Sequence, residues 1–307
     1  VRSLFFNLEY ELNESNLTDA VVSLLTDHGL SVKGFHDQCL IAPGEIVNKQ
    51  SLPYQVFTAF KKAYLSELGL RMREMYGKPK PHKYQKSIGV KSNLSPLKAL
   101  KYVGFNNVDI PFGEKAAHEQ LELFCKDALA DYKTQRDFPA IDGTSKLSAY
   151  LAVGILSVRQ CWHSADFYRH QLNTGFQEGI DTWISELIWR DFYRHFIYFY
   201  PELCKGKAFK AKTDHLPWNT DDGLLSAWKE GKTGYPIVDA AMRQLNETGW
   251  MHNRLRMVVA MFLTKHLFLD WRLGESYFME KLVDGDFASN NGGWQWSAST
   301  GVDAAPY

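Results

Sequence analysis

The chain has 307 residues, 45% of them hydrophobic, and its 35 basic side chains balance 35 acidic ones. This composition indicates a globular protein of one large or two ordinary domains, and the zero net charge excludes a protein that coats nucleic acid over its whole surface. No apolar run is long enough to span a membrane, and the four cysteines lack metal-binding or disulfide spacing, so we expect a cytoplasmic protein without a metal.

The first part of the chain has the pattern of an α/β domain. A strand-like segment over residues 4–12 precedes a helical run over 16–28, and short apolar pieces follow at 30–35 and 39–43. Because Val1 is not an initiator methionine and the chain opens on a strand-like run, we expect a fragment that begins inside a domain.

The organisation along the chain predicts three zones. We assign residues 1–42 to the remnant of an α/β domain, 43–115 to a loop-rich connector with a helical patch near 56–70, and 116–307 to a helical domain. Residues 71–91 contain seven Lys or Arg against one Glu, which favours an exposed linker over a nucleic-acid site.

A predicted helix over residues 181–200 carries an unusual face. Side chains at spacings of three and four share it, namely Trp183, Glu186, Trp189, Arg190 and Tyr193. Two interpretations stay open. Either Glu186 and Arg190 form an ion pair one turn apart on the wet surface while the tryptophans pack inward, or the face is one wall of a polar pocket.

A second predicted helix, over about 249–269, aligns Asn253, Met257 and Ala260 along one stripe. A methionine on such a stripe is usually core filling, although its flexible thioether also tolerates flat aromatic partners. The pattern alone favours the core.

The segment 284–300 combines two acids with a Gly-Gly break and two tryptophans. Glycine lets a backbone approach a ligand closely, but Asn-Gly and Gly-Gly are also common turn dipeptides, and Asp284 and Asp286 suit helix caps equally well. A ligand site and an ordinary turn both remain open.

Upstream, Thr144, Ser145 and Ser148 precede a helical run. Hydroxyls and backbone N–H groups at a helix N-terminus suit an anion such as phosphate, whereas capping alone explains the same residues. Standard nucleotide and hydrolase signatures, including G-x-G-x-x-G, are absent.

Five ordered motifs resemble those of the photolyase/cryptochrome family and together span nearly the whole chain. They are QRDFPAIDGTSKLS, WISELIWRDFYRH, EGKTGYPIVDAAMRQL, GWMHNRLRM and DGDFASNNGGWQWSASTG. The resemblance is closest to bacterial class I cyclobutane pyrimidine dimer photolyases. It implies the remnant of an α/β antenna domain, followed by an all-helical domain that binds FAD without a Rossmann fingerprint and is truncated at its C-terminal end.

The resemblance assigns one set of residues to FAD, whose reduced form is the active one. This set is Tyr132, Thr144, Ser145, Lys146, Leu147, Ser148, Asp284, Gly285, Asp286 and Asn290. Asn290 is placed at flavin N5, where a neutral amide accepts the N5–H of the reduced flavin. Lys146 stands where relatives often have Arg.

Trp294, Trp271 and Trp218 match the family's electron-transfer chain from the flavin to the surface.

Another set is expected to bind a DNA lesion flipped out of the helix. Within it, the resemblance implies that Glu186, Asn253 and Met257 act with Asn290 as the catalytic group. The full lesion- and DNA-binding set is Arg136, Glu186, Trp189, Arg190, Asn253, Arg254, Met257 and Trp296. Relatives specific for (6-4) lesions have histidines in place of Asn253 and Met257, and DASH-type cryptochromes usually have Tyr in place of Trp296, so a cyclobutane dimer is the expected substrate.

Asn13, Glu14, Cys204 and Lys205 match residues that contact a 5,10-methenyltetrahydrofolate antenna. The resemblance therefore implies this second chromophore in the intact protein.

The sequence thus predicts a light-dependent DNA repair enzyme, a carbon–carbon lyase. By resemblance, excited reduced FAD donates an electron to the flipped cyclobutane pyrimidine dimer and splits it. We expect a monomer that acts on UV-damaged DNA in the bacterial cytoplasm, at the nucleoid and not at a membrane. Two alternatives remain: a blue-light-sensing cryptochrome flavoprotein without repair activity, and a helical nucleic-acid-binding or scaffold module whose aromatic residues form a core without a cofactor.

Overall fold

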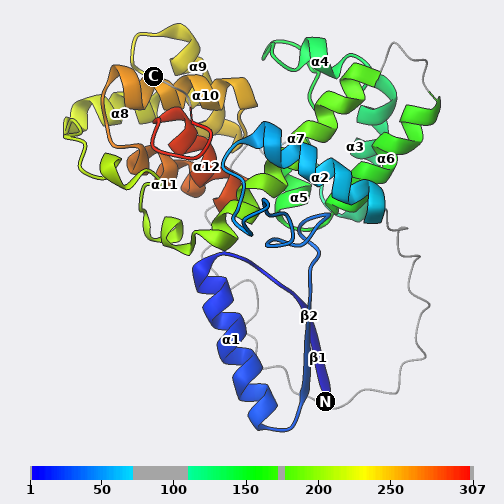
Figure 1. Cartoon of the computed structure of the whole chain (residues 1–307). Coiled ribbons are helices and arrows are strands. Elements are labelled where there is room, and N and C mark those ends of the chain that lie inside the picture. The colour runs from blue at the N-terminus through cyan, green and yellow to red at the C-terminus, as the bar shows by residue number, and fades with distance from the viewer. Residues whose placement is uncertain (1, 72–109, 172–176, 305–307) are drawn as a thin grey trace, which may run out of the picture.

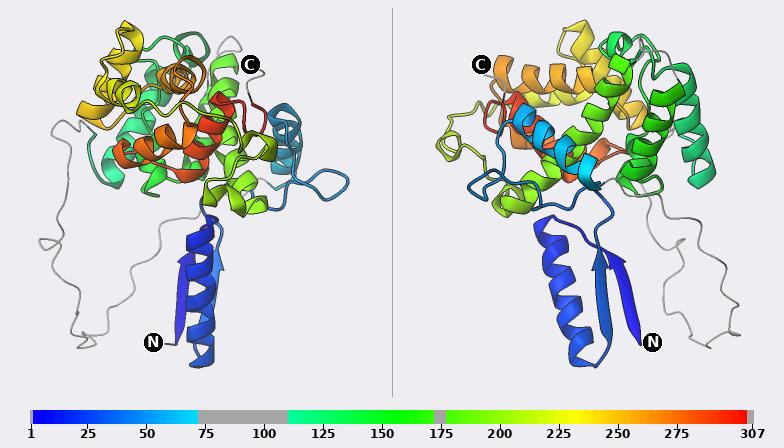
Figure 2. Two further views of the ribbon diagram at one scale, coloured as in Figure 1. Left: turned by 90° about the vertical axis from the view of Figure 1, so that its left-hand side faces the viewer. Right: turned by 45° about the vertical axis from the view of Figure 1, so that its right-hand side comes forward.

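The computed structural model describes residues 2–71, 110–171 and 177–304, and these form a small α/β unit and a larger helical part (Figure 1). Both views of Figure 2 show the α/β unit projecting from one side of the helical part. Most of the connector motif at 71–91 lies outside the described residues.

The α/β unit is the strand β1 (Ser3–Asn7), the helix α1 (Leu12–Asp27) and the strand β2 (Ser31–Phe35). The two strands pair in parallel, with Ser3 opposite Ser31 and Asn7 opposite Phe35. Parallel strands need a crossover connection, and α1 supplies it. The strand-like run at 4–12 is therefore strand only over its first residues, because the chain bends at Glu11 into a helix that starts earlier than the pattern indicated.

The segment after β2 ties the α/β unit to the helical part. The Leu40 backbone N–H donates to the carboxylate of Asp191 at 3.0 Å, and the imidazole Nε2 of His195 lies 3.1 Å from the Ile41 carbonyl oxygen. Both partners are buried residues of one long helix, so the chain leaves the α/β unit along a fixed path.

A first hydrophobic core lies around the long helix α7 (Gln177–Phe199). The helices packed with it are α2 (Phe57–Arg71), α3 (Glu114–Asp127), α4 (Tyr132–Gln135), α5 (Ser148–Ala152) and α6 (Val158–Gln171). The predicted connector contributes to this core, because α2 packs on α7 and the Phe57 ring stacks on Trp189 with centroids 3.6 Å apart.

A second core lies among the C-terminal helices, which are α8 (Asp222–Glu230), α9 (Pro236–Thr248), α10 (Asn253–Met261), α11 (Trp271–Lys281) and α12 (Phe287–Ser297). The short turns η3 (Pro201–Lys205) and η4 (Ala211–Thr213) lead into them, and α10 continues into the π-helical turn η5 (Phe262–His266). Local sequence sets these ends: the Asp221 side chain caps α8, and α9 begins at Pro236 and ends at left-handed Gly249.

Helix α12 joins the two cores, because it packs on α7 of the first and on α10 and α11 of the second. The prediction of a break at the Gly-Gly pair is wrong, because α12 continues through Gly292 and Gly293 without interruption. None of the described helices is both long enough and apolar enough to cross a bilayer.

Candidate functional site

A central cavity of about 520 Å³ opens where α7, α10 and α12 meet. Two smaller cavities of about 210 and 140 Å³ adjoin it and share Asn253, Arg256 and Asp284 with it. This size is within the range of sites for small molecules and cofactors. The predicted residues lining these cavities are Tyr132, Arg136, Thr144, Ser145, Lys146, Leu147, Ser148, Glu186, Trp189, Arg190, Asn253, Arg254, Met257, Asp284, Asp286, Asn290, Trp294 and Trp296.

The predicted face of α7 forms one wall of the central cavity. All five of its residues line that wall, so the pocket interpretation is confirmed. The alternative ion pair between Glu186 and Arg190 does not form: Glu186 accepts a hydrogen bond from the Arg136 guanidinium. Arg190 instead donates to the backbone carbonyl oxygens of Gln38 and Leu151. Its side chain is only 14% exposed, so it anchors the wall rather than facing outward to a phosphate.

Helix α10 presents Asn253 and Met257 to the same space. The helix begins at a histidine cap, because His252 Nδ1 accepts the Arg254 backbone N–H at 3.1 Å. Arg254 is held between the Asp137 carboxylate at 2.7 Å and the Met257 sulfur at 3.2 Å. Met257 is therefore part of a cavity wall, and the core-filling interpretation of this methionine is wrong.

Two ion pairs, each with one buried member, hold the acids of the Asp-Gly-Asp motif. Arg256 contacts Asp284 at 2.7 Å, and Arg194 contacts Asp286 at 2.6 Å. Burial alone would raise the pKa of Asp286, but the cations Arg194 and Arg190 and hydrogen bonds from Ser289 outweigh it and hold the pKa below its ordinary value. Both acids therefore sit at the cavity with a cation already paired to each.

Asp284 keeps one oxygen available. Its Oδ2 accepts from Arg256, whereas its buried Oδ1 has no hydrogen-bond partner among the residues that the structure describes. An unpaired buried carboxylate oxygen costs free energy, and a ligand that donates a hydrogen bond from the cavity removes that cost. Asp286 has another role as well, because its carboxylate caps α12; the capping interpretation is confirmed for this acid.

The glycines of α12 serve the packing of the helix and the cavity. A Cβ atom on Gly292 would lie 2.1 Å from Tyr193 Cδ1, so α12 approaches α7 more closely than any other residue allows. A Cβ atom on Gly293 would meet no protein atom within 4 Å, and Gly293 lines the central cavity. One glycine permits close packing, and the other leaves space for a ligand.

Asn290, two residues before Gly292, has a fixed amide orientation. Its Nδ2 donates to the Glu275 backbone carbonyl at 2.9 Å, and the residue lines the smaller cavity next to Trp294. Because the amino group is already engaged, the amide oxygen is the free group on the cavity side.

The segment 144–148 lines the smaller cavity opposite α10. Side-chain capping does not explain it, because the N-cap of α5 is Leu147 and no side chain caps that helix. Lys146 has a left-handed backbone, with φ of 53°, and its ammonium group turns away to Asp142 at 2.8 Å. Lys146 therefore faces the cavity with its main chain, and its side chain points elsewhere. An Arg at this position would leave the main-chain contact unchanged.

The three tryptophans of the expected electron-transfer chain lie in or against the second core. Trp294 lines the small cavity, and its ring fits over Gly274 of α11, where a Cβ would lie 2.1 Å from the indole. Trp271 begins α11 and is 1% exposed. Trp218 is partly exposed, and the backbone N–H after it donates to the Phe268 carbonyl at 2.7 Å, which brings it beside the start of α11.

The expected antenna residues also come together, away from the central cavity. η3 packs on α1, and Cys204 is near enough to Glu11 and Glu14 for their charges to act on its thiol. Burial, followed by these acids, raises the pKa of that thiol. Lys205 is paired with Glu202 at 2.8 Å, and Asn13 is exposed in the first turn of α1.

Sequence reasoning missed Arg194 and Arg256, which hold the two acids. The signal was present, because two acids destined for burial require cations, and each arginine lies on a helix already singled out. Gly285, in contrast, does not line the cavities; its N–H donates to the Leu282 carbonyl and closes the turn that contains Asp284.

Two family models match the chain. Residues 183–307 match the FAD binding domain of DNA photolyase, and residues 1–82 match the DNA photolyase model. Among curated relatives, the deoxyribodipyrimidine photo-lyases of Escherichia coli and Salmonella typhimurium are 49% and 47% identical over 100% of this chain and 64% of their own length.

Solved structures are similar over the same extent. A class III photolyase from Agrobacterium tumefaciens superposes with a TM-score of 0.87 at 34% identity, covering 100% of this chain and 63% of its own. A cryptochrome from Synechocystis superposes with a TM-score of 0.88 at 31% identity, covering 100% and 64%. The chain thus spans a little less than two thirds of the length of these relatives.

Proposed function

Because this chain belongs to the photolyase/cryptochrome family, we propose that the protein binds FAD in the central cavity and its neighbours and uses light to split cyclobutane pyrimidine dimers in DNA. The observation that carries the proposal is the gathering of four predicted residues around two adjoining cavities. Glu186 of α7 and Asn253 and Met257 of α10 line the central cavity, and Asn290 lines the adjoining cavity with Trp294.

The residues present fit FAD. The unpartnered Oδ1 of Asp284 suits an N–H or O–H donor of the cofactor, and the open space over Gly293 suits its flat ring. The segment 144–148 and Tyr132 line the adjoining cavity, where the phosphates and the ribityl chain are proposed to lie. Asn290, whose amide nitrogen is held by the Glu275 carbonyl, would offer its amide oxygen to flavin N5, and this would favour the reduced form because that form carries a hydrogen there.

When bound and reduced, FAD supplies light-driven transfer of one electron to the dimer and its return after the ring opens. The chain's own residues hold the lesion for this step. Glu186 accepts hydrogen bonds from the pyrimidine edge, Trp189 and Trp296 form apolar walls, and Asn253 adds a polar contact. Trp189 is suited to this role because the stack with Phe57 fixes its ring.

The cations at the mouth of the cavity are proposed to position the DNA. Arg136 and Arg254 are partly exposed, with side chains 24% and 32% accessible, and each is already paired with an acid. Phosphate contacts of this kind fix orientation and carry no sequence information. Arg190 belongs to the wall, as described above.

Trp294, Trp271 and Trp218 are proposed to reduce oxidised FAD by passing electrons inward from the surface. Burial supports the outer position of Trp218, since Trp294 and Trp271 are 2% and 1% exposed and Trp218 is partly exposed. Large aromatic rings ionise more readily than aliphatic side chains, and these three lie in one packed unit.

The remaining expectations also stand as proposals. Asn13, Glu14, Cys204 and Lys205 would contact a 5,10-methenyltetrahydrofolate antenna, since η3 and the start of α1 are adjacent. We further propose that the protein acts as a monomer on UV-damaged DNA, in a bacterial cytoplasm and at the nucleoid.

The test is repair by the purified protein. After reconstitution with FAD and chemical reduction, we expect near-UV light to restore thymines in an oligonucleotide that contains one cyclobutane dimer, with a dark sample as the control. A yellow protein that leaves the dimer intact would instead support a blue-light sensor, the alternative favoured by the similarity to a cryptochrome. A colourless protein after reconstitution would contradict both flavin functions.

A further inference from the structure

Trp271, the middle tryptophan of the proposed chain, lies under a cation. The guanidinium carbon of Arg272 is 4.8 Å from the centroid of the Trp271 ring. The indole Nε1 is buried and has no hydrogen-bond partner among the described residues. An oxidised Trp271 therefore has no acceptor for its proton, keeps the proton, and carries a full positive charge in a site of low dielectric.

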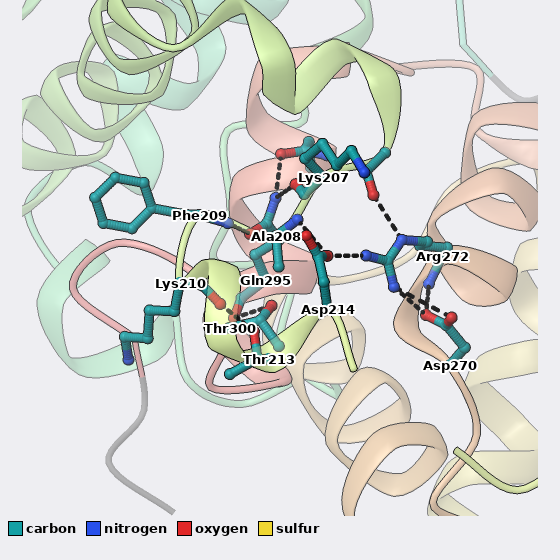
Figure 3. A network of polar contacts seen from close by, with 12 residues as sticks. Lys207, Ala208, Phe209, Lys210, Thr213, Asp214, Asp270, Arg272, Gln295 and Thr300 are labelled. Carbon is teal, nitrogen blue, oxygen red and sulfur yellow. Dashed lines mark hydrogen bonds and ion pairs between the residues drawn. The ribbon is translucent and has the colours of Figure 1, made fainter. Parts of the chain in front are cut away.

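Two acids hold the same guanidinium (Figure 3). Arg272 Nη1 lies 3.1 and 3.2 Å from the two carboxylate oxygens of Asp270, and Nη2 lies 2.5 Å from Asp214 Oδ1. Its Nε donates to the Gly206 carbonyl at 2.6 Å. We call Asp214, Arg272 and Asp270 the charge triad; its two carboxylates and one guanidinium give it a formal charge of minus one.

The triad is held in place by backbone contacts. Asp270 caps α11 through the Arg272 N–H at 3.0 Å, and Asp214 accepts the Ala208 N–H at 2.9 Å. Gln295 of α12 accepts the Phe209 N–H and donates to the Lys207 carbonyl, as the dashed lines in Figure 3 indicate. The loop that carries Asp214 is thereby fixed to both α11 and α12.

Electrostatics connects this arrangement to Trp271. A lone guanidinium beside the indole would repel a positive charge on the ring and make Trp271 harder to oxidise, whereas the two carboxylates attract that charge. The pair of acids outweighs the cation by one unit of formal charge.

We propose that the charge triad sets the oxidation potential of Trp271, and so decides whether the electron vacancy left on Trp294 moves on towards Trp218 or returns. This inference rests on the proposed function. In the step concerned, one electron passes from Trp271 to oxidised Trp294, no bond forms or breaks, and no proton moves. Asp214, Arg272 and Asp270 act through Trp271 and are positioning residues.

A series of variants separates charge from structure. Asp214→Asn and Asp270→Asn each bring the triad to zero while keeping an oxygen for the Ala208 and Arg272 N–H groups. Their combination gives plus one, Arg272→Gln gives minus two, and Asp214→Asn with Arg272→Gln restores minus one. The measurement is the yield of the long-lived tryptophan radical after a laser flash on the FAD-loaded, oxidised protein.

We expect this yield to fall by roughly threefold or more for each negative charge removed. Arg272→Gln should equal or exceed the wild type, and the charge-restored double variant should return to the wild-type yield. If all variants lose yield together, or if the order does not follow charge, the triad acts through structure alone and the inference is overturned.

Two controls accompany the series. In the cofactor-free protein, the Arg272 Nε proton should have an NMR shift displaced by the indole ring current in both single Asp→Asn variants, and a Trp271→Leu variant should abolish the displacement. Chemically reduced FAD-loaded variants should repair dimers as the wild type does, because repair does not use the tryptophans. If the wild-type protein does not bind flavin or does not repair dimers, the proposed function is contradicted. If the protein repairs dimers but its radical yield does not depend on the charge of the triad, only the inference about the charge triad is contradicted.

Discussion

Gly292 of α12 lies in direct contact with the ring of Tyr193 on α7, so that a Cβ atom on the glycine would stand 2.1 Å from Tyr193 Cδ1. The neighbouring Gly293 has no protein atom within 4 Å of the corresponding position. Two adjacent glycines in one helix therefore have opposite surroundings.

This difference predicts opposite effects of alanine. Gly292→Ala should destabilise the protein by about 1–3 kcal/mol, because the ring or the helix must move. Gly293→Ala should stabilise the cofactor-free protein by about 0.5–1 kcal/mol through helix propensity, but weaken FAD binding because the methyl group enters the cavity. Urea unfolding and FAD titration measure the two effects. Equal stabilities for the two variants would contradict the packing described.

Asp284→Asn should weaken FAD binding by about tenfold or more, equivalent to about 1.4 kcal/mol, because the amide has one neutral accepting oxygen in place of two anionic ones and cannot serve both Arg256 and the cofactor. Asp222→Asn, in the exposed first turn of α8, is the matched control and should leave the affinity unchanged. Isothermal titration with FAD provides the comparison, and equal affinities in both variants would rule out the role given to the Asp284 carboxylate.

The cap of α10 predicts a pH dependence. Burial, then the charges of Arg254 and Arg256, lower the pKa of His252. As pH falls, the unfolded chain therefore binds the proton first, near the ordinary His pKa of about 6.5. The stability contributed by neutral His252 is complete above that pH and decreases below it, by at most about 1.4 kcal/mol per pH unit.

His252→Asn keeps a good helix cap without a titrating group. Urea unfolding between about pH 5 and 8 should give a flatter pH profile for this variant than for the wild type. His195, whose pKa burial also lowers, contributes to both profiles, so the difference in slope belongs to His252. Parallel profiles would show that the cap does not titrate in this range.

Trp218→Phe should remove most of the photoreduction of oxidised FAD under steady blue light, because the last, partly exposed donor is lost. Trp162→Phe, in the margin of the first core, is the control of equal chemistry and should behave as the wild type. Absorption spectra during illumination report the loss of oxidised flavin. Unchanged photoreduction in Trp218→Phe would remove this residue from the chain.

Glu186→Gln should slow dimer repair while FAD binding persists, because the lesion contact is lost and the cofactor contacts remain. Glu178→Gln, on the first turn of the same helix with its side chain 74% exposed, should repair at the wild-type rate. Repair is followed by restoration of thymine on a dimer oligonucleotide. A normal repair rate in Glu186→Gln would place the lesion elsewhere.

The α7 face could be predicted because helical spacing alone places its residues together. The hydrogen-bond partner of Glu186 could not be predicted in this way. Arg136 lies fifty residues before Glu186, and the packing of α4 on α7 brings the two together. The Gly-Gly pair misled for a related reason: the dipeptide favours a turn, but here the glycines lie inside α12, where the contact with Tyr193 leaves no room for a Cβ atom on Gly292.

Met257 illustrates another limit. A methionine at helical spacing has the same pattern whether it faces a core or the wall of a cavity, because both surroundings are apolar. The family resemblance supplied the assignment that periodicity could not. The connector was predicted from its loops, yet Phe57 within it stacks on Trp189, a contact between segments far apart in sequence.

The division of the helical part into two cores with the cavity between them bears on how the protein unfolds. An occupant that touches both cores leaves when either one melts, so its binding energy resists the melting of each and ties the two events together. The filled protein should unfold in a single cooperative transition. Without the occupant, the stability of each core depends on its own contacts. Heating the empty protein should therefore give two unfolding transitions in place of one.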